Sequence, residues 1–294
     1  MNAVETVSLT KFYGKSRGIN NIDLTVAEGD FFGFIGPNGA GKSTTIRILT
    51  GLISQTSGTA KIFGKDAGKT DILADIGYMP SEANFYHGMK VREVIKYSAK
   101  LRKHDCAKEA ARLCERLELD VNKKISELSL GNRKKVSIVC ALQHKPRLCI
   151  LDEPTSGLDP LMQREFYAIL EERNTEGATI FLSSHILSEI QKYCKSAAVI
   201  REGKLLVFDL VENLVHTNAK KVTLSGISEP PKLDGIGNVE IDGDGDNVIF
   251  LYSGEPRKLL SVLAPLPITD VNITEPDLEE IFMHYYAEGK NDNS

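Results

Sequence analysis

The sequence has no tryptophan, no excess of basic residues and no long apolar run. Lysine and arginine number 36 against 40 acidic residues, which gives a formal net charge of −4. A chain without a basic surplus carries no overall field that attracts DNA or RNA, so we expect no nucleic-acid partner. Because no stretch approaches the roughly 20 apolar residues of a membrane span, any role at a membrane must come through a partner.

The five cysteines form an odd set, and none are spaced like a zinc site or a redox motif. Free cysteine behaves as a small apolar side chain, so we expect reduced thiols that pack in the interior. The first residues, MNAVETVSLTKF, contain no apolar segment of signal-peptide length. The chain is therefore predicted to stay in the cytoplasm. The cysteines are Cys106, Cys114, Cys140, Cys149 and Cys194.

Strand-like and helix-like patterns alternate along most of the chain. Residues 147–151, 178–183 and 197–200 are short apolar runs separated by helical patterns, an order typical of a parallel α/β sheet. Upstream, further strands are predicted at 4–10, 19–26, 31–35 and 76–79.

Two regions differ from this alternation. Between Val91 and Leu142 apolar residues recur every three or four positions, which predicts a helical insertion. After about residue 210 short strand-like pieces surround Pro230-Pro231 and a turn rich in Gly and Asp. We therefore predict two domains, 1–214 and 215–294, of which the second is a small α+β domain.

A glycine-rich segment, GPNGAGKST, fits the pattern G-x-x-x-x-G-K-[ST] and lies between a predicted strand and a predicted helix. Its backbone N–H groups and the positive end of the helix are suited to surround phosphates. Lys42 is expected to reach the β- and γ-phosphates of a nucleoside triphosphate, and the Ser43 hydroxyl to bind Mg²⁺. A plain glycine-rich turn is the alternative. The predicted contacts are Gly36, Asn38, Gly39, Ala40, Gly41, Lys42, Ser43 and Thr44.

Two carboxylates and a histidine follow predicted strands. Asp152-Glu153 ends one apolar run, and His185 follows the next. Ligands of α/β sheets bind at the carboxyl ends of the strands. Asp152 is therefore expected to hold Mg²⁺ through water, Glu153 to deprotonate the attacking water, and His185 to contact the γ-phosphate. The alternatives are a helix cap for the acidic pair and a purely structural histidine.

Together these motifs resemble the nucleotide-binding domain of ABC transporters over roughly residues 4–215. The resemblance includes LSLGN at 128–132, CILDE at 149–153, SGLD at 156–159 and the histidine at 185. It implies an ATPase with a mixed sheet around the phosphate-loop helix and a helical subdomain at about 81–144. ATP and Mg²⁺ are the implied ligands.

The same resemblance implies how the site is completed. In the family the LSLGN segment of one subunit covers the nucleotide that is held by the other. Ser129 and the backbone of Gly131 would then donate to the γ-phosphate across a head-to-tail homodimer. The position of LSLGN before a predicted helix agrees with an anion site, although Ser129 could serve only as a helix cap.

Two further positions are assigned by the resemblance. Tyr13 precedes a glycine as in the family's aromatic loop, so we expect its ring to stack on adenine and Phe12 to lie in the core. The family usually has a glutamine that touches magnesium after the strand ending in Met79-Pro80, whereas this chain has Ser81. A serine hydroxyl is a shorter ligand, so contact through water or through Glu82 is an alternative to direct contact by Ser81.

The last part of the chain suggests the kind of transporter. The ending EPDLEEIFMHYY, in which we predict a capped helix, resembles ATPase subunits of bacitracin-type exporters of drugs, antibiotics and peptides. Separately encoded membrane permease subunits are then expected as partners, with the chain peripheral on the inner face of the membrane. The acidic segment DGDGD lacks the later ligands of a calcium loop, and we predict a hairpin turn there.

Two rival functions remain. A soluble ABC ATPase that acts on ribosomes or DNA is one, although the chain has a single phosphate loop and no long heptad repeat. A GTPase or small-molecule kinase is the other, although no N-K-x-D motif is present, since residues 122–125 read NKKI. The transported substrate cannot be inferred from the residues of this chain.

Overall fold

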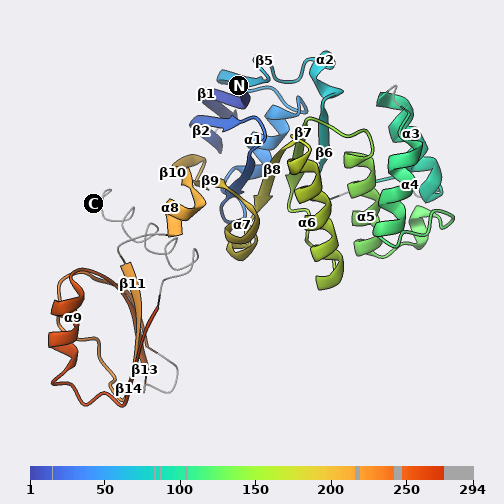
Figure 1. Cartoon of the computed structure of the whole chain (residues 1–294). Coiled ribbons are helices and arrows are strands. Elements are labelled where there is room, and N and C mark those ends of the chain that lie inside the picture. The colour runs from blue at the N-terminus through green and yellow to red at the C-terminus, as the bar shows by residue number, and fades with distance from the viewer. Residues whose placement is uncertain are drawn as a thin grey trace. The chain divides into compact units, whose positions relative to one another are not determined.

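Figure 1 shows the protein as a computed structural model that describes residues 1–14, 16–82, 84–86, 88–102, 105–215, 219–241 and 247–274. Its contacts gather into two units, Met1–Asp209 and Leu210–Ser294, and each is described here by itself. Among the described residues, no helix is both long enough and apolar enough to cross a membrane.

The first strands form an antiparallel sheet in the order β2-β1-β4-β5. Alternating side chains face the interior, as the sequence pattern predicts. The strands are longer than predicted because the pairing of β1 with β2 continues past the alternating residues. They are β1 (Asn2–Tyr13), β2 (Ser16–Ala27), β4 (Ser57–Ile62) and β5 (Lys65–Asp66).

A second sheet has the strand order β10-β9-β3-β8-β7-β6. The pairs β3–β8, β3–β9, β7–β8 and β6–β7 are parallel, so their carboxyl ends lie at one edge. Strands that are buried on both faces read as continuous apolar runs, which explains the pattern in the sequence. They are β3 (Phe31–Ile35), β6 (Ile76–Met79), β7 (Leu148–Asp152), β8 (Thr179–Ser184), β9 (Ser196–Arg201) and β10 (Lys204–Leu210).

The helix after the glycine-rich segment lies between the two sheets. This helix, α1 (Lys42–Leu49), contacts β2 and β4 of the first sheet and β7 of the second. Its Ile46 and Leu49 belong to a core cluster that includes residues of both sheets. Three other helices complete this part of the unit: α2 (Thr70–Leu73) before β6, and α6 (Pro160–Thr175) and α7 (Leu187–Tyr193) against β8.

The predicted helical insertion is confirmed as a group of helices beside β6 (Figure 1). Helix α5 contacts β6, α3 and α4, so it connects the group to the sheet. The elements are α3 (Val91–Arg102), α4 (Ala107–Arg116), the 3-10 turn η1 (Ile125–Glu127) and α5 (Leu130–Leu142).

The second unit is built on an antiparallel sheet in the order β12-β13-β11-β14. Leu259 and Leu263 of α9 pack against its apolar face, which includes Val222 and Phe250. The elements are α8 (Val211–Val215), β11 (Ala219–Ser225), β12 (Ile236–Ile241), β13 (Asn247–Ser253), α9 (Pro256–Leu263) and β14 (Asp270–Thr274). The turn expected at 242–246 and the helix expected after Thr274 lie outside the described residues.

The prediction that Phe12 lies in the core is wrong, whereas the cysteines are mostly in the interior as predicted. Phe12 is exposed, because β1 pairs with β4 only as far as Thr10 and the tip of the β1–β2 hairpin extends beyond that partner. None of the five cysteines forms a disulfide, and all except Cys140 are buried. Burial raises the pKa of Cys149 in β7 to about 12, so its thiol stays protonated.

Candidate active site

The glycine-rich loop runs from the end of β3 to the start of α1. Gly36 is required by space, because a Cβ there would lie 2.2 Å from the carbonyl oxygen of Ile200. Gly41 precedes α1 with φ +112°, in the left-handed region that favours glycine. These two glycines let the loop fold tightly over the N-terminus of an eight-residue helix, whose free N–H groups favour an anion.

Lys42 is the first residue of α1, and its side chain is almost completely buried. Its Nζ donates to Gly36 O at 2.5 Å and to Pro37 O at 3.3 Å, and it lies 3.3 Å from Oε1 of Glu153. The ammonium is thus folded back along the loop and paired with a carboxylate. A phosphate that enters must compete with this internal pair.

Glu153 follows directly after β7 and has an unusual backbone. Its φ is +49°, and its N–H donates to Ser183 O at 3.0 Å. Oε2 lies 2.6 Å from Nδ1 of His185, whereas Oε1 is buried, has no hydrogen bond and faces Lys42 only as a charge partner. The carboxylate keeps an unshared acceptor oxygen, which is what a base for water needs.

Asp152 is the last residue of β7 and is buried. Its Oδ1 accepts a hydrogen bond from Ser183 Oγ at 3.1 Å. Within the described residues, no three His, Cys, Asp or Glu side chains gather as a ready-made metal site. Mg²⁺ at nucleotide sites takes one or two protein oxygens and completes its shell with phosphate and water. A hydroxyl from Ser43 and a carboxylate from Asp152 fit that requirement when a triphosphate is present.

A cleft of about 310 Å³ opens over the loop. It combines the phosphate-loop backbone, an aromatic ring from the β1–β2 hairpin, and polar groups that follow β6 and β7. Ala40 is not on its wall: the residue is buried and its N–H donates to Pro37 O at 3.1 Å, so it supports the loop. The cleft is lined by Tyr13, Gly18, Pro37, Asn38, Gly39, Gly41, Lys42, Ser43, Thr44, Ser81 and Glu153.

Ser129 and Gly131 do not line this cleft. Ser129 is exposed and caps α5, since its Oγ accepts from the N–H of Asn132 at 3.3 Å. Gly131 packs so closely against the SGLD segment that a Cβ there would lie 2.6 Å from the carbonyl oxygen of Gly157. No residue of the LSLGN segment lines the cleft: Ser129 is exposed, whereas Leu128 is buried and Gly131 packs against Gly157.

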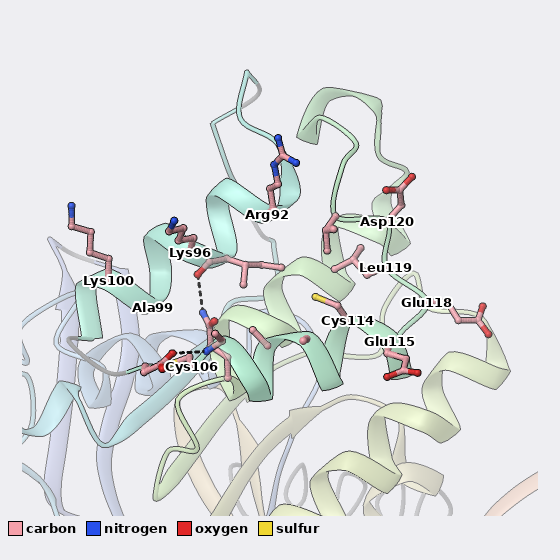
Figure 2. A pocket seen from close by; sticks show the side chains of 17 residues that line it. Arg92, Lys96, Ala99, Lys100, Cys106, Cys114, Glu115, Glu118, Leu119 and Asp120 are labelled. Carbon is pink, nitrogen blue, oxygen red and sulfur yellow. Dashed lines mark hydrogen bonds between the residues drawn. The ribbon is translucent and has the colours of Figure 1, made fainter.

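Figure 2 shows a larger cavity, of about 1010 Å³, between α3 and α4. Arg92, Lys96 and Lys100 stand on its α3 side, with Glu115 and Glu118 across from them. The wall between these charges is mostly apolar and contains none of the predicted site residues. The cations of this cavity are accompanied by carboxylates, and no phosphate loop lines it, so we place the active site at the smaller polar cleft.

Three residues at or beside the cleft, Gly18, Pro37 and Lys134, were not among the contacts predicted from the sequence. Gly18 lines it beside Tyr13, where a Cβ would lie 2.9 Å from the tyrosine ring. Lys134 of α5 sends its ammonium to backbone oxygens next to the cleft. Lys134 lies in a helix whose inward residues are mostly apolar but also include Lys135 and Ser137, so the sequence pattern does not single it out, and no known motif spacing assigns it a role.

Comparisons with known proteins identify the family of the chain. The profile of the ABC transporter family matches residues 19–156. The bacitracin transport ATP-binding protein of Bacillus licheniformis is 35% identical, over 97% of this chain and 98% of its own length. The chain belongs to the ABC transporter ATP-binding proteins. The predictions of family, fold class and ATPase activity are thereby confirmed.

Other relatives of this ABC ATPase extend the comparison. The linearmycin resistance ATP-binding protein of Bacillus subtilis is 29% identical over 96% of this chain and 97% of its own length. The lantibiotic transport ATP-binding protein of Streptococcus pyogenes is 36% identical over 70% of this chain and 92% of its own. A solved ATP-binding subunit of an ABC transporter superposes with a TM-score of 0.67 and 28% identity, over 72% of this chain and 91% of that chain.

Proposed function

We propose that this ABC ATPase is the subunit that drives an exporter of drugs, antibiotics or peptides. The observation that carries the proposal is similarity over nearly the full length to the bacitracin transport protein. Relatives named for linearmycin resistance and lantibiotic transport support the same class of cargo. The ATPase cassette alone is shared with transporters of many kinds, so the match through the second unit is the informative part.

ATP binding begins with a change of partner for Lys42. In the free chain this ammonium faces two loop carbonyls and Glu153. A γ-phosphate offers a stronger, charge-assisted acceptor, so Lys42 turns toward it while the N–H groups of the loop and α1 receive the remaining phosphate charge. Tyr13, on the rim of the same cleft, supplies an aromatic face for the adenine ring.

Mg²⁺ would be held by the Ser43 hydroxyl together with Asp152, with Ser81 as a further oxygen on the cleft wall. When bound, the ion neutralises charge on the phosphates. Asp152 is oriented for this role by the hydrogen bond from Ser183. Because these oxygens come from three separate segments, metal affinity is expected to depend on bound triphosphate.

Glu153 is the base in this proposal. Once Lys42 has turned to the phosphate, Oε1 is free to orient a water and accept its proton. His185 holds the other carboxylate oxygen at 2.6 Å, and 51% of its side chain is exposed, so its ring can also reach a γ-phosphate that is bound beside it. The histidine thus links the base to the phosphate that is attacked.

A second copy of the chain is needed to close the site. Ser129 is exposed, as are the large apolar side chains of its neighbour Leu130 and of Leu161 in the first turn of α6, at 57% and 70%. Exposed apolar residues around a polar anion-binding segment suit a face that becomes covered by protein. We propose a head-to-tail homodimer in which Ser129 and Gly131 of one copy meet the γ-phosphate held by the other.

The membrane partner is proposed to be a separately encoded permease, with this chain on the cytoplasmic face of the membrane. A pocket of about 490 Å³ lies between α1, α2, β6 and the end of α3. Leu52 and Leu101 on its wall are exposed, which suits an apolar segment of the permease. Ile76 and Tyr78 of β6 line this pocket, and the chain that leaves β6 carries Ser81 on the cleft wall, so the strand would connect permease movement to the cleft.

Export can be tested in the organism that carries the gene. A deletion strain complemented with the wild-type chain should resist bacitracin, linearmycin or a lantibiotic better than one complemented with Lys42→Ala. Equal sensitivity of the two strains to all three compound classes, with purified Lys42→Ala inactive as an ATPase, would refute the exporter proposal while leaving the ATPase assignment intact.

The dimer is tested separately by light scattering on the purified Glu153→Gln chain. With Mg·ATP its mass should double from the 32.4 kDa of one chain, and Ser129→Arg should prevent the doubling without weakening ATP binding. A mass that stays at the value of one chain under saturating Mg·ATP would overturn the head-to-tail arrangement.

A further inference from the structure

A buried lysine of the helical subdomain contacts two strand ends at the active site. Lys134 lies in the second turn of α5 and is 3% exposed. Its Nζ donates to Ser81 O at 2.6 Å and to Glu153 O at 2.8 Å. Burial lowers the pKa of Lys134, while the carboxylates of Asp152 and Glu153 act in the opposite direction. An ammonium buried in this way is stable only while its acceptors stay in place.

The two acceptors lie on neighbouring segments, directly after the ends of β6 and β7. Strands β6 and β7 are parallel, and their last pair is Met79 with Leu151. Ser81 and Glu153 therefore occupy equivalent positions two residues further along. Beyond the last β6–β7 pair, the Lys134 ammonium connects these two segments where no backbone hydrogen bond of the sheet joins them.

Glu153 needs this support because of its backbone. A residue other than glycine with φ +49° is held there by its surroundings. The N–H of Glu153 is fixed by Ser183 O at 3.0 Å, and its carbonyl by Lys134. Loss of either bond releases the peptide that aims the carboxylate at Lys42 and His185.

We propose that Lys134 is a positioning residue for ATP hydrolysis, which holds the backbone of Glu153 and connects it to the helix that carries Ser129 and Gly131. The inference rests on the proposed function, because it takes Glu153 as the base. Since Ser129 begins the same helix, a shift of α5 when a partner closes on it moves Lys134 and thereby the position of Glu153. The same ammonium reaches the Ser81 segment, where the family usually has a glutamine.

The test compares three variants of the full chain. Lys134→Met keeps the stem and removes the donors, Lys134→Arg keeps donors and charge, and Lys135→Met removes a neighbouring buried ammonium from the same helix as the control. Lys134→Met should lower kcat at least about tenfold, because a base displaced by a fraction of an ångström loses its geometry. KM for ATP should stay within about threefold, since the phosphate loop is untouched.

Two readouts separate positioning from simple stability. Lys134→Arg should recover part of kcat, and hydrogen exchange in residues 148–155 should speed up in Lys134→Met but not in Lys135→Met. Adding Lys134→Met to Glu153→Gln should cause no further loss, because both changes act on one group. A kcat for Lys134→Met within about twofold of wild type, with exchange unchanged, overturns the inference. Equal losses in Lys135→Met do so as well.

The outcome also separates this inference from the proposed function. If Glu153→Gln hydrolyses ATP like the wild type, the base assignment fails, and Lys134 has no base to position. If Glu153→Gln is inactive and Lys134→Met is fully active, the proposed function stands and only the role of Lys134 is rejected.

Discussion

Replacing Glu153 with glutamine should slow hydrolysis and tighten ATP binding at the same time. The carboxylate lies 3.3 Å from Lys42 Nζ, and at an effective dielectric constant of about 20 that gives a gross attraction of about 5 kcal/mol. In Glu153→Gln, Lys42 still faces its two carbonyl acceptors, and in the wild type 17% of the Glu153 side chain is exposed, so water screens the pair. Only part of this attraction is therefore gained by ATP binding when the carboxylate is removed. We expect about 1–2 kcal/mol in favour of ATP, roughly a 5- to 30-fold lower Kd.

The expected loss in turnover follows from the missing base. Proton transfer to a placed carboxylate contributes about 10²- to 10⁴-fold, so kcat of Glu153→Gln should fall within that range. Phosphate release measures kcat and calorimetry measures Kd, with Glu171→Gln on the exposed side of α6 as the control for a changed net charge. A Kd that rises instead of falling would show that Lys42 and Glu153 do not compete with nucleotide. A kcat that matches the control would remove Glu153 as the base.

Four further outcomes follow from the same contacts. Lys42→Ala should weaken ATP binding by about 10- to 100-fold in calorimetry, because a charge-assisted contact is lost. Gly131→Ala should lower stability by about 1–3 kcal/mol in urea unfolding, since its Cβ would press on the carbonyl of Gly157. Ser129→Arg should leave the Kd of the single chain unchanged and abolish ATP-dependent association in light scattering. Cys149, with a pKa of about 12, should react with a thiol reagent at pH 8 only after unfolding, and more readily as pH rises.

The main elements of the cassette could be predicted from local patterns. Continuous apolar runs indicated the buried parallel strands, and the three- and four-residue period indicated the helical group. The phosphate loop was predictable because its glycines and lysine fall within one short segment, GPNGAGKST. In contrast, Phe12 was assigned to the core although it is exposed, because alternation along β1 does not tell where its neighbour β4 stops pairing.

Contacts between distant residues required the tertiary structure. The pairing of Lys42 with Glu153, the hydrogen bond of His185 to the same carboxylate, and the reach of Lys134 to Ser81 join segments far apart in sequence. No spacing rule encodes them, since they depend on how parallel strands align their ends.

The amino-acid sequence by itself determined the chemistry that this protein can carry: a phosphate loop, two carboxylates after a buried strand, and an LSLGN segment before a helix. These features are local, because each needs only neighbouring residues and their backbone preferences. The tertiary structure alone decided which atoms meet. It brought the ends of β6, β7 and β8 to one edge, placed Glu153 between Lys42 and His185, and put Lys134 across the gap where the β6–β7 ladder stops. Such geometry follows from packing of the whole cassette, in which each strand end is positioned by its neighbours.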